Sequence, residues 1–198
     1  MGKSSGGALL KMMRVAFHQY AQHDQSQFWE WIEGALDLLP PLSFAQRCVQ
    51  ERLLQHLSEF VELNEIGIVI PGPFAVRMPE EMQRGREPDL LFVPNIFVEA
   101  IQENYVNSHG VAIVVEIADA RSRYRDRVDK FKDYQLAGIP EYWIIDVDEH
   151  SASFYSLHKD NRYHKAELAE DGLYHSTVLK GYTLDPRLLW QECSDRPA

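Results

Sequence analysis

The fold is decided by three short apolar runs, the first of which follows the acid in Glu87-Pro88-Asp89-Leu90-Leu91-Phe92-Val93. The second spans residues 111–115 and continues into Glu116, and the third spans residues 142–145 after a Gly-Ile-Pro turn. Short runs of β-branched and aromatic residues bounded by glycine or proline predict strands, and their near-continuous hydrophobicity predicts burial on both faces. The sequence therefore predicts a sheet whose central strands are covered on both sides.

Two carboxylates, Asp89 and Glu116, stand beside these predicted strands. A buried carboxylate is costly unless a cation or a metal ion partners it. Positive charge is concentrated near both, because six lysines and arginines fall between residues 121 and 132, and Arg84 and Arg86 precede Asp89. The alternatives are a structural salt bridge to an arginine and, for the charge run, a solvated helix face.

Two long helices are predicted. Ser43 is a suitable N-cap for a helix that reaches about Leu63, and its apolar residues recur at helical spacing as Val49, Leu53, Leu57 and Phe60. Residues 121–136 form the second, ended by a glycine and a proline. A shorter amphipathic stretch covers residues 15–20, and residues 95–104 are expected to form a short helix.

Further strands are expected on either side of the central runs. Residues 66–71 and 74–78 favour two strands about a Pro-Gly-Pro turn, and residues 79–86 a polar loop. Residues 28–34 alternate like a strand, although residues 34–39 would also extend a helix. After the third run, residues 151–157, 163–168 and 173–179 are typical of antiparallel additions.

The composition is that of a soluble globular protein. The chain has 198 residues, 45% of them hydrophobic and 25% charged, and no apolar run approaches the roughly 20 residues that span a bilayer. Its two cysteines show no Cys-x-x-Cys spacing, and its start lacks a secretory signal, so we expect a cytoplasmic protein. A net charge of -10 argues against non-specific nucleic-acid binding through a basic coat.

No repeat or linker divides the chain. We expect one domain over residues 15–193, with flexible ends at residues 1–14 and 194–198.

The paired acids, with a lysine on the following helix, are the parts of a metal-dependent phosphodiesterase site. Mg²⁺ takes oxygen ligands and keeps several waters, so two carboxylates and a backbone carbonyl can hold it. The metal lowers the pKa of a bound water and stabilises charge on the scissile phosphate. Motifs for a serine nucleophile, a zinc helix, a Walker loop or a dinucleotide fold are absent from the sequence.

Four segments together resemble the Uma-type family of restriction-endonuclease-like proteins, within the PD-(D/E)XK nuclease superfamily. They are residues 87–93, residues 113–117, the spacing Ser122, Asp126, Lys130, Tyr134, and residues 137–146. Residues 30–34 and 178–184 extend the resemblance more weakly. It implies an α/β restriction-endonuclease-like core with a mixed twisted sheet flanked by helices and extra antiparallel strands at the C-terminus. It also implies a Mg²⁺-dependent endonuclease acting on DNA.

Carried onto this sequence, the resemblance makes Asp89 and Glu116 the metal-binding carboxylates. We expect the carbonyl of Ile117 as a third ligand. The superfamily's lysine is expected two positions after Glu116, where this chain has Ala118. The spacing selects Lys130 on the next helix instead, as the residue that positions or activates the water. The alternative for Lys130 is an intrahelical ion pair four residues back.

Four further residues are candidates for supporting roles: Glu30, Asp119, Asp126 and Tyr134. Asp126, Lys130 and Tyr134 are four apart and share one side of the helix. Glu30 is a supporting acid unless the segment simply packs its tryptophans. Asp119-Ala120 departs from the serine and proline of relatives, and Ala45, with Gln46 beside it, replaces a histidine that is common in the family.

The expected metal is Mg²⁺, with Mn²⁺ as a substitute. DNA is the expected substrate and RNA the alternative; no membrane contact is expected. A homo-oligomer, most simply a dimer, follows from the two cuts that duplex cleavage needs. A different class of function also fits the sequence: a catalytically inactive module on the same fold that binds nucleic acid or another protein.

Overall fold

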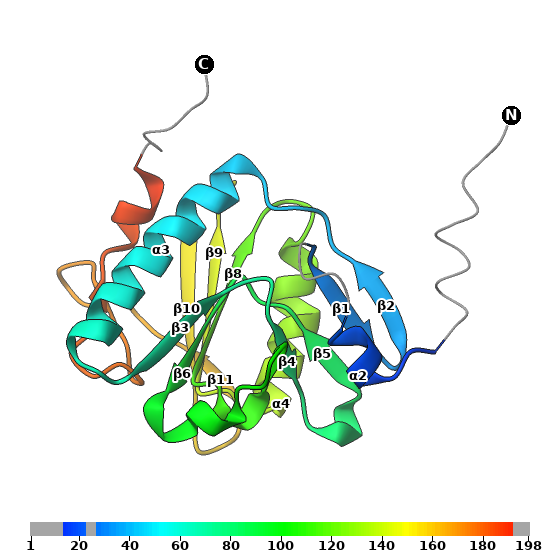
Figure 1. Cartoon of the computed structure of the whole chain (residues 1–198). Coiled ribbons are helices and arrows are strands. Elements are labelled where there is room, and N and C mark those ends of the chain that lie inside the picture. Colours follow the sequence, from blue (N-terminus) through cyan, green and yellow to red (C-terminus); the bar gives the residue numbers. More distant parts are fainter. Residues whose placement is uncertain (1–13, 23–26, 192–198) are drawn as a thin grey trace, which may run out of the picture.

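A six-stranded sheet forms the centre of the computed structural model, which describes residues 14–22 and 27–191 (Figure 1). Its strand order is β11-β10-β9-β8-β6-β3. The strands are β3 (Gly67–Pro71), β6 (Leu90–Pro94), β8 (Ile113–Ala118), β9 (Glu141–Asp146), β10 (Ser151–Leu157) and β11 (Tyr163–Lys165). β8 and β9 are parallel and all other neighbours are antiparallel, so the sheet is mixed as expected. The three apolar runs are β6, β8 and β9.

Helix α3 (Phe44–Leu63) covers one face of this sheet (Figure 1). The Ser43 side chain accepts a hydrogen bond from the backbone N–H of Gln46 at 3.2 Å, which satisfies a donor at the helix start. Val49, Leu53 and Leu57 are buried against β6, β8 and β9, which confirms the predicted apolar stripe.

The other face carries a second helix and a small sheet. The helix runs through a π-helical turn (Arg125–Lys130) into α4 (Phe131–Leu136). The small sheet has the order β2-β1-β5-β4-β7. Its strands are β1 (Trp29–Ile32), β2 (Ala35–Leu38), β4 (Ala75–Arg77), β5 (Arg84–Arg86) and β7 (Tyr105–Asn107). Val76 of β4, Val106 of β7 and Tyr134 pack in one cluster with the far side of β6, β8 and β9.

Several local expectations need correction. β1 and β2 form a hairpin that turns at Glu33 and Gly34, both with positive φ, so residues 34–39 do not extend a helix. β3 and β4 form as predicted but belong to different sheets. β5 lies in the predicted polar loop and β7 directly after the predicted short helix. Three-residue strands of polar composition, such as Arg84-Gly85-Arg86, carry too little alternation to be recognised.

The remaining elements are short. α2 (Phe17–Tyr20) lies within the predicted amphipathic stretch, and Asn95–Ala100 is a 3-10 helix. β12 (Tyr174–His175) pairs with β13 (Thr183–Leu184), ahead of a 3-10 helix at Pro186–Trp190. No helix within the described ranges is long and apolar enough to cross a membrane. The expected flexible ends, apart from Arg14, and Cys193 lie outside the described residues.

Candidate active site

Asp89 and Glu116 lie opposite each other where β6 begins and β8 ends. The register pairs Leu90 with Val115, and extending it by one residue places Asp89 across from Glu116. The Asp89 backbone N–H continues the ladder, donating to the Val115 carbonyl at 3.1 Å. Because side chains alternate along a strand, both acids point to the face covered by the second helix. They are only 5% and 3% exposed.

Two residues of that helix hold the Glu116 carboxylate. Lys130 Nζ lies 2.7 Å from Oε2, and the Tyr134 hydroxyl donates to Oε1 at 2.7 Å. Their spacing of four places both side chains on one side of the helix. Asp126 shares this side, but its Oδ1 is 3.6 Å from Lys130 Nζ and has no hydrogen-bond partner among the described residues. The predicted intrahelical pair between Asp126 and Lys130 is therefore longer than the contact between Lys130 and Glu116.

The small sheet contributes a buried ion-pair chain to the same place. Glu30 of β1 is fully buried, and its Oε1 is 3.1 Å from Lys130 Nζ. Its Oε2 accepts a hydrogen bond from Arg86 of β5. Arg86 also donates to Asp133 Oδ2 from Nε at 3.0 Å and Nη2 at 2.6 Å. Glu30 is therefore part of the polar site rather than of a packed tryptophan segment.

Helix α3 fixes the backbone around Asp89 through two buried glutamines. Gln46 Nε2 donates to the Ile117 carbonyl at 2.6 Å, and Gln50 Nε2 donates to the Asp89 carbonyl at 2.9 Å. The Ile117 N–H in turn donates to Asp89 Oδ2 at 2.5 Å. Neither glutamine was a candidate. Their signal in the sequence is two amides four apart, next to the apolar stripe that includes Val49.

Asp119 lines the pocket, but its carboxylate is already bonded. Oδ1 accepts from the backbone N–H of Arg121 at 2.8 Å and of Ser122 at 3.2 Å, and Oδ2 accepts from the Arg121 side chain. Desolvation alone would raise the pKa of Asp119, but the hydrogen bonds from Arg121 outweigh it and hold that pKa below its usual value. Asp119 therefore shapes the turn that enters the helix.

Burial dominates the electrostatics of the paired acids. Desolvation raises the pKa of Asp89 to about 7, although Lys130 opposes the shift. Desolvation likewise raises the pKa of Glu116 well above its usual value against the same ammonium group. For Lys130, desolvation would lower the pKa, but Glu116 and Glu30 outweigh it and raise that pKa. The ammonium therefore keeps its proton at neutral pH, but its charge does not offset the effect of burial on the pKa of either acid.

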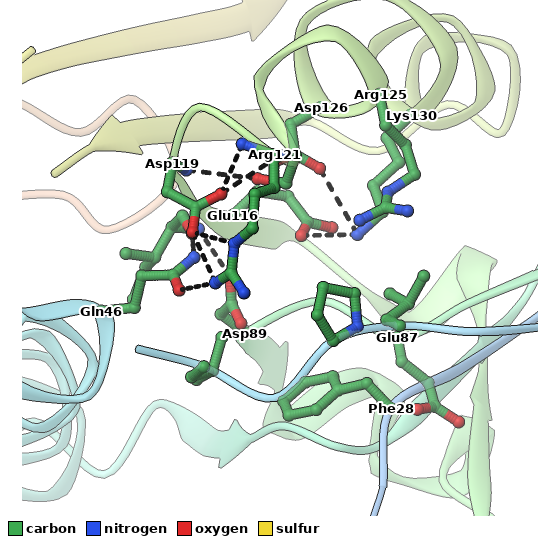
Figure 2. A pocket seen from close by; sticks show the side chains of 15 residues that line it. Phe28, Gln46, Glu87, Asp89, Glu116, Asp119, Arg121, Arg125, Asp126 and Lys130 are labelled. Atoms are coloured by element: carbon green, nitrogen blue, oxygen red, sulfur yellow. Dashed lines mark hydrogen bonds and ion pairs between the residues drawn. The ribbon is translucent and has the colours of Figure 1, made fainter. Parts of the chain in front are cut away.

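These groups border one pocket (Figure 2). Its polar wall holds both paired acids and Lys130, and Arg121 crosses it between Asp119 and Gln46. Its apolar wall consists of Phe28, Leu39, Pro40 and Leu42. The predicted residues thus come together from separate elements: Asp89, Glu116, Ile117, Asp119, Asp126 and Lys130 line the pocket, and Glu30 and Tyr134 lie behind it.

The donor set fits a hard divalent cation with few protein ligands. Among the described residues, no group of three or more histidine, cysteine, aspartate or glutamate side chains is arranged to hold a metal. Asp89, Glu116 and the Ile117 carbonyl supply oxygen only, as Mg²⁺ prefers, and the carbonyl keeps a second lone pair beside its bond from Gln46. Burial raises the pKa of both acids, and a bound cation would favour their charged forms.

Comparisons with known proteins identify the fold and the family of the chain. The fold is similar to the crystal structure of a putative nuclease belonging to DUF820 from Anabaena variabilis ATCC 29413, with a TM-score of 0.70 and 12% identity. The similarity covers 89% of this chain and 97% of that one. No curated protein matches the chain. Residues 15–187 match the family described as "Uma2: Putative restriction endonuclease", and the chain therefore belongs to the Uma2 family.

Proposed function

We propose that the protein is a Mg²⁺-dependent endonuclease that hydrolyses phosphodiester bonds in DNA, with Mn²⁺ as an effective substitute. One observation carries the proposal: Asp89 and Glu116 lie opposite each other on one face of the sheet, and a buried ammonium contacts Glu116 at 2.7 Å. The family and the nuclease-like fold support the same class of activity.

Asp89, Glu116 and the carbonyl of Ile117 would hold the metal ion. When bound, it would lower the pKa of a water and neutralise charge on the phosphate. The protein's own part is to fix these oxygens in advance. Gln46 orients the Ile117 carbonyl, and Tyr134 fixes the Glu116 oxygen that Lys130 does not contact. Such groups keep the ligands in place without reorganisation during the reaction.

Lys130 acts as a fixed positive charge. Because its ammonium keeps its proton beside Glu116 and Glu30, it cannot remove a proton from the attacking water. It can donate a hydrogen bond to that water or to a phosphate oxygen, and so position the one or stabilise charge on the other. Of the two roles expected for Lys130, positioning is the one its charge favours.

Glu30 and Arg86 keep the ammonium in place. Glu30 forms an ion pair with Lys130 through Oε1 and accepts a hydrogen bond from Arg86 at Oε2, and Asp133 fixes the guanidinium. These ion pairs join the helix to the small sheet, so a shift of either element would displace the Lys130 ammonium. We infer that Glu30 is a positioning residue that acts through Lys130.

The test is metal-dependent nicking of supercoiled plasmid by the purified protein. Asp89→Asn, Glu116→Gln and Lys130→Ala should each reduce nicking in Mg²⁺ at least a hundredfold, the scale on which electrostatic groups of active sites act. Glu99→Gln, which alters an exposed acid on the 3-10 helix at Asn95–Ala100, is the control and should retain activity. Equal residual activity in the three site variants would identify a contaminant and refute the site.

A second candidate is a catalytically inactive module that binds nucleic acid or another protein. It is favoured by the hydrogen bonds that Asp89 and Ile117 already make within the protein, and by the absence of a three-side-chain metal group in the described residues. Tight binding of a duplex without cleavage in Mg²⁺ or Mn²⁺ would establish this module. Parallel assays with RNA decide the substrate class.

We also propose that the protein acts as a homodimer, since two cuts are needed to sever a duplex. Light scattering of the protein in solution measures its mass directly. A mass of two chains is expected, and a monomer that still cleaves both strands would contradict the dimer.

A further inference from the structure

Most cations around the pocket are bound to acids of the protein itself. Arg121 pairs with Asp119, and Arg86 pairs with Glu30 and Asp133. Lys130 pairs with Glu116, as described above. Two more arginines of the same helical segment, at positions 123 and 127, both bind Asp146 at the end of β9. Their charge is therefore already used within the fold.

Arg125 differs from these cations. It lines the pocket together with Asp89, Glu116 and Lys130, and Figure 2 shows its side chain extending into the pocket beside that of Lys130. It makes no ion pair within the described part of the chain, and its Nε is buried without a hydrogen-bond partner there. It acts on Asp89 and Glu30 only at a distance, by lowering their pKa values.

A guanidinium in this state requires a partner. Burying an N–H without a hydrogen-bond acceptor costs free energy, and the cost is recovered when an acceptor arrives. The nearby acids do not supply one: Asp89 accepts from Ile117, and Glu116 from Lys130 and Tyr134. Asp126 Oδ1 also lacks a hydrogen-bond partner among the described residues, but it forms no ion pair with Arg125. An acceptor that enters the pocket from outside would complete Arg125, and an anion would bind its positive charge most strongly.

We propose that Arg125 binds the phosphate group of the substrate, from its place beside Lys130 in the pocket. This inference rests on the proposed function. The planar guanidinium presents several N–H groups that match two oxygens of a phosphodiester. Arg125 would draw the phosphate toward Lys130 and toward the cation that Asp89 and Glu116 would hold.

The overall charge makes a single arginine important. With a net charge of -10 the protein repels a polyanion at long range, so binding depends on a few local cations. Losing one of them should weaken binding much more than in a strongly basic protein. The competing explanation is that Arg125 only offsets the surplus of acids, and it predicts no change in substrate affinity.

The experiment compares Arg125→Gln with Arg127→Gln, which removes the same charge from an exposed residue two positions away. Arg127 binds Asp146 and Glu149 and does not line the pocket. Cleavage of a short duplex in Mg²⁺ gives kcat and KM. Fluorescence anisotropy in Ca²⁺ at several salt concentrations gives Kd and its salt dependence, and circular dichroism checks the fold.

Arg125→Gln should raise KM and Kd about tenfold, as expected for loss of a charge-assisted hydrogen bond. It should also reduce the slope of log K against log salt by about 0.9, the value for one phosphate contact. Arg127→Gln should change neither quantity more than twofold. Arg125→Lys should restore part of the affinity, and it serves as the second variant if the glutamine protein does not fold.

The two proposals fail differently. Wild-type protein that cleaves DNA, together with an Arg125→Gln variant whose KM, Kd and salt slope match it within twofold, overturns the role of Arg125 and leaves the nuclease intact. Wild-type protein that neither binds nor cleaves DNA or RNA overturns the nuclease itself, and the role of Arg125 with it.

Discussion

Replacing Lys130 with methionine should destabilise the protein in a pH-dependent way. Methionine keeps the length of the apolar stem but removes the ammonium, which lies 2.7 Å from Glu116 and 3.1 Å from Glu30. Both carboxylates would remain buried without this cation. Removing one partner of a buried ion pair costs about 3–5 kcal/mol. In a protein of this size that corresponds to a fall in Tm of roughly 6–20 °C.

The pH dependence follows from the carboxylates that are left. Burial already raises the pKa of Glu116 in the wild type, and loss of the ammonium would raise it further. An acid whose folded pKa lies above its unfolded pKa binds more protons in the folded state. Stability is then greatest below the unfolded pKa and falls as pH rises toward the folded pKa. The cost of Lys130→Met should therefore be smaller at pH 5 than at pH 8.

Urea denaturation at pH 5 and pH 8, without metal, measures this difference. Lys132→Met is the matched control, because Lys132 lies on the same helix and is exposed, and its stability should stay within about 0.5 kcal/mol of wild type. A cost that is the same at both pH values, or below about 1 kcal/mol at pH 8, would refute the buried ion pair as described.

Three further predictions concern the same site. Burial raises the pKa of Asp89 to about 7, so protons compete with metal for its carboxylate near neutral pH. In calorimetric scans, Mg²⁺ should therefore raise Tm more at pH 8 than at pH 6. The Asp89→Asn variant should lose this difference. Glu30→Gln should lower kcat but leave KM within about twofold in steady-state cleavage, because Glu30 acts through Lys130 and does not touch the substrate. Tyr134→Phe removes one hydrogen bond to Glu116 and should cost about 1–3 kcal/mol in urea denaturation; an unchanged midpoint would contradict that bond.

The central strands could be predicted because burial on both faces leaves a strong signal. The runs at residues 90–93, 111–115 and 142–145 correspond to β6, β8 and β9. Most of these strands begin and end within two residues of the predicted bounds. The second helix was predictable from the glycine and proline that end it, and the spacing of Asp126, Lys130 and Tyr134 placed these side chains on one side of it. The charge run proved to be divided. Lys130 points inward, while the arginines at 123 and 127 lie on the outer side, as the solvated-face interpretation expected.

The small sheet and its ion pairs could not be predicted. Arg86 looks like any arginine in a polar loop until β5 pairs with β1 and brings it to Glu30. Gln46 and Gln50 look like ordinary helix residues, and only the packing of α3 on the sheet brings them to the carbonyls of Ile117 and Asp89. These contacts join residues 39 to 71 positions apart, and no local pattern encodes them.

The most direct test of the proposed centre is a crystal of the protein soaked in Mn²⁺, with the metal located by its anomalous scattering. We expect one peak between the Asp89 and Glu116 carboxylates, about 2.0–2.5 Å from an oxygen of each. A peak that lies elsewhere, or no peak there at Mn²⁺ concentrations that support cleavage, would contradict the assignment of these two acids.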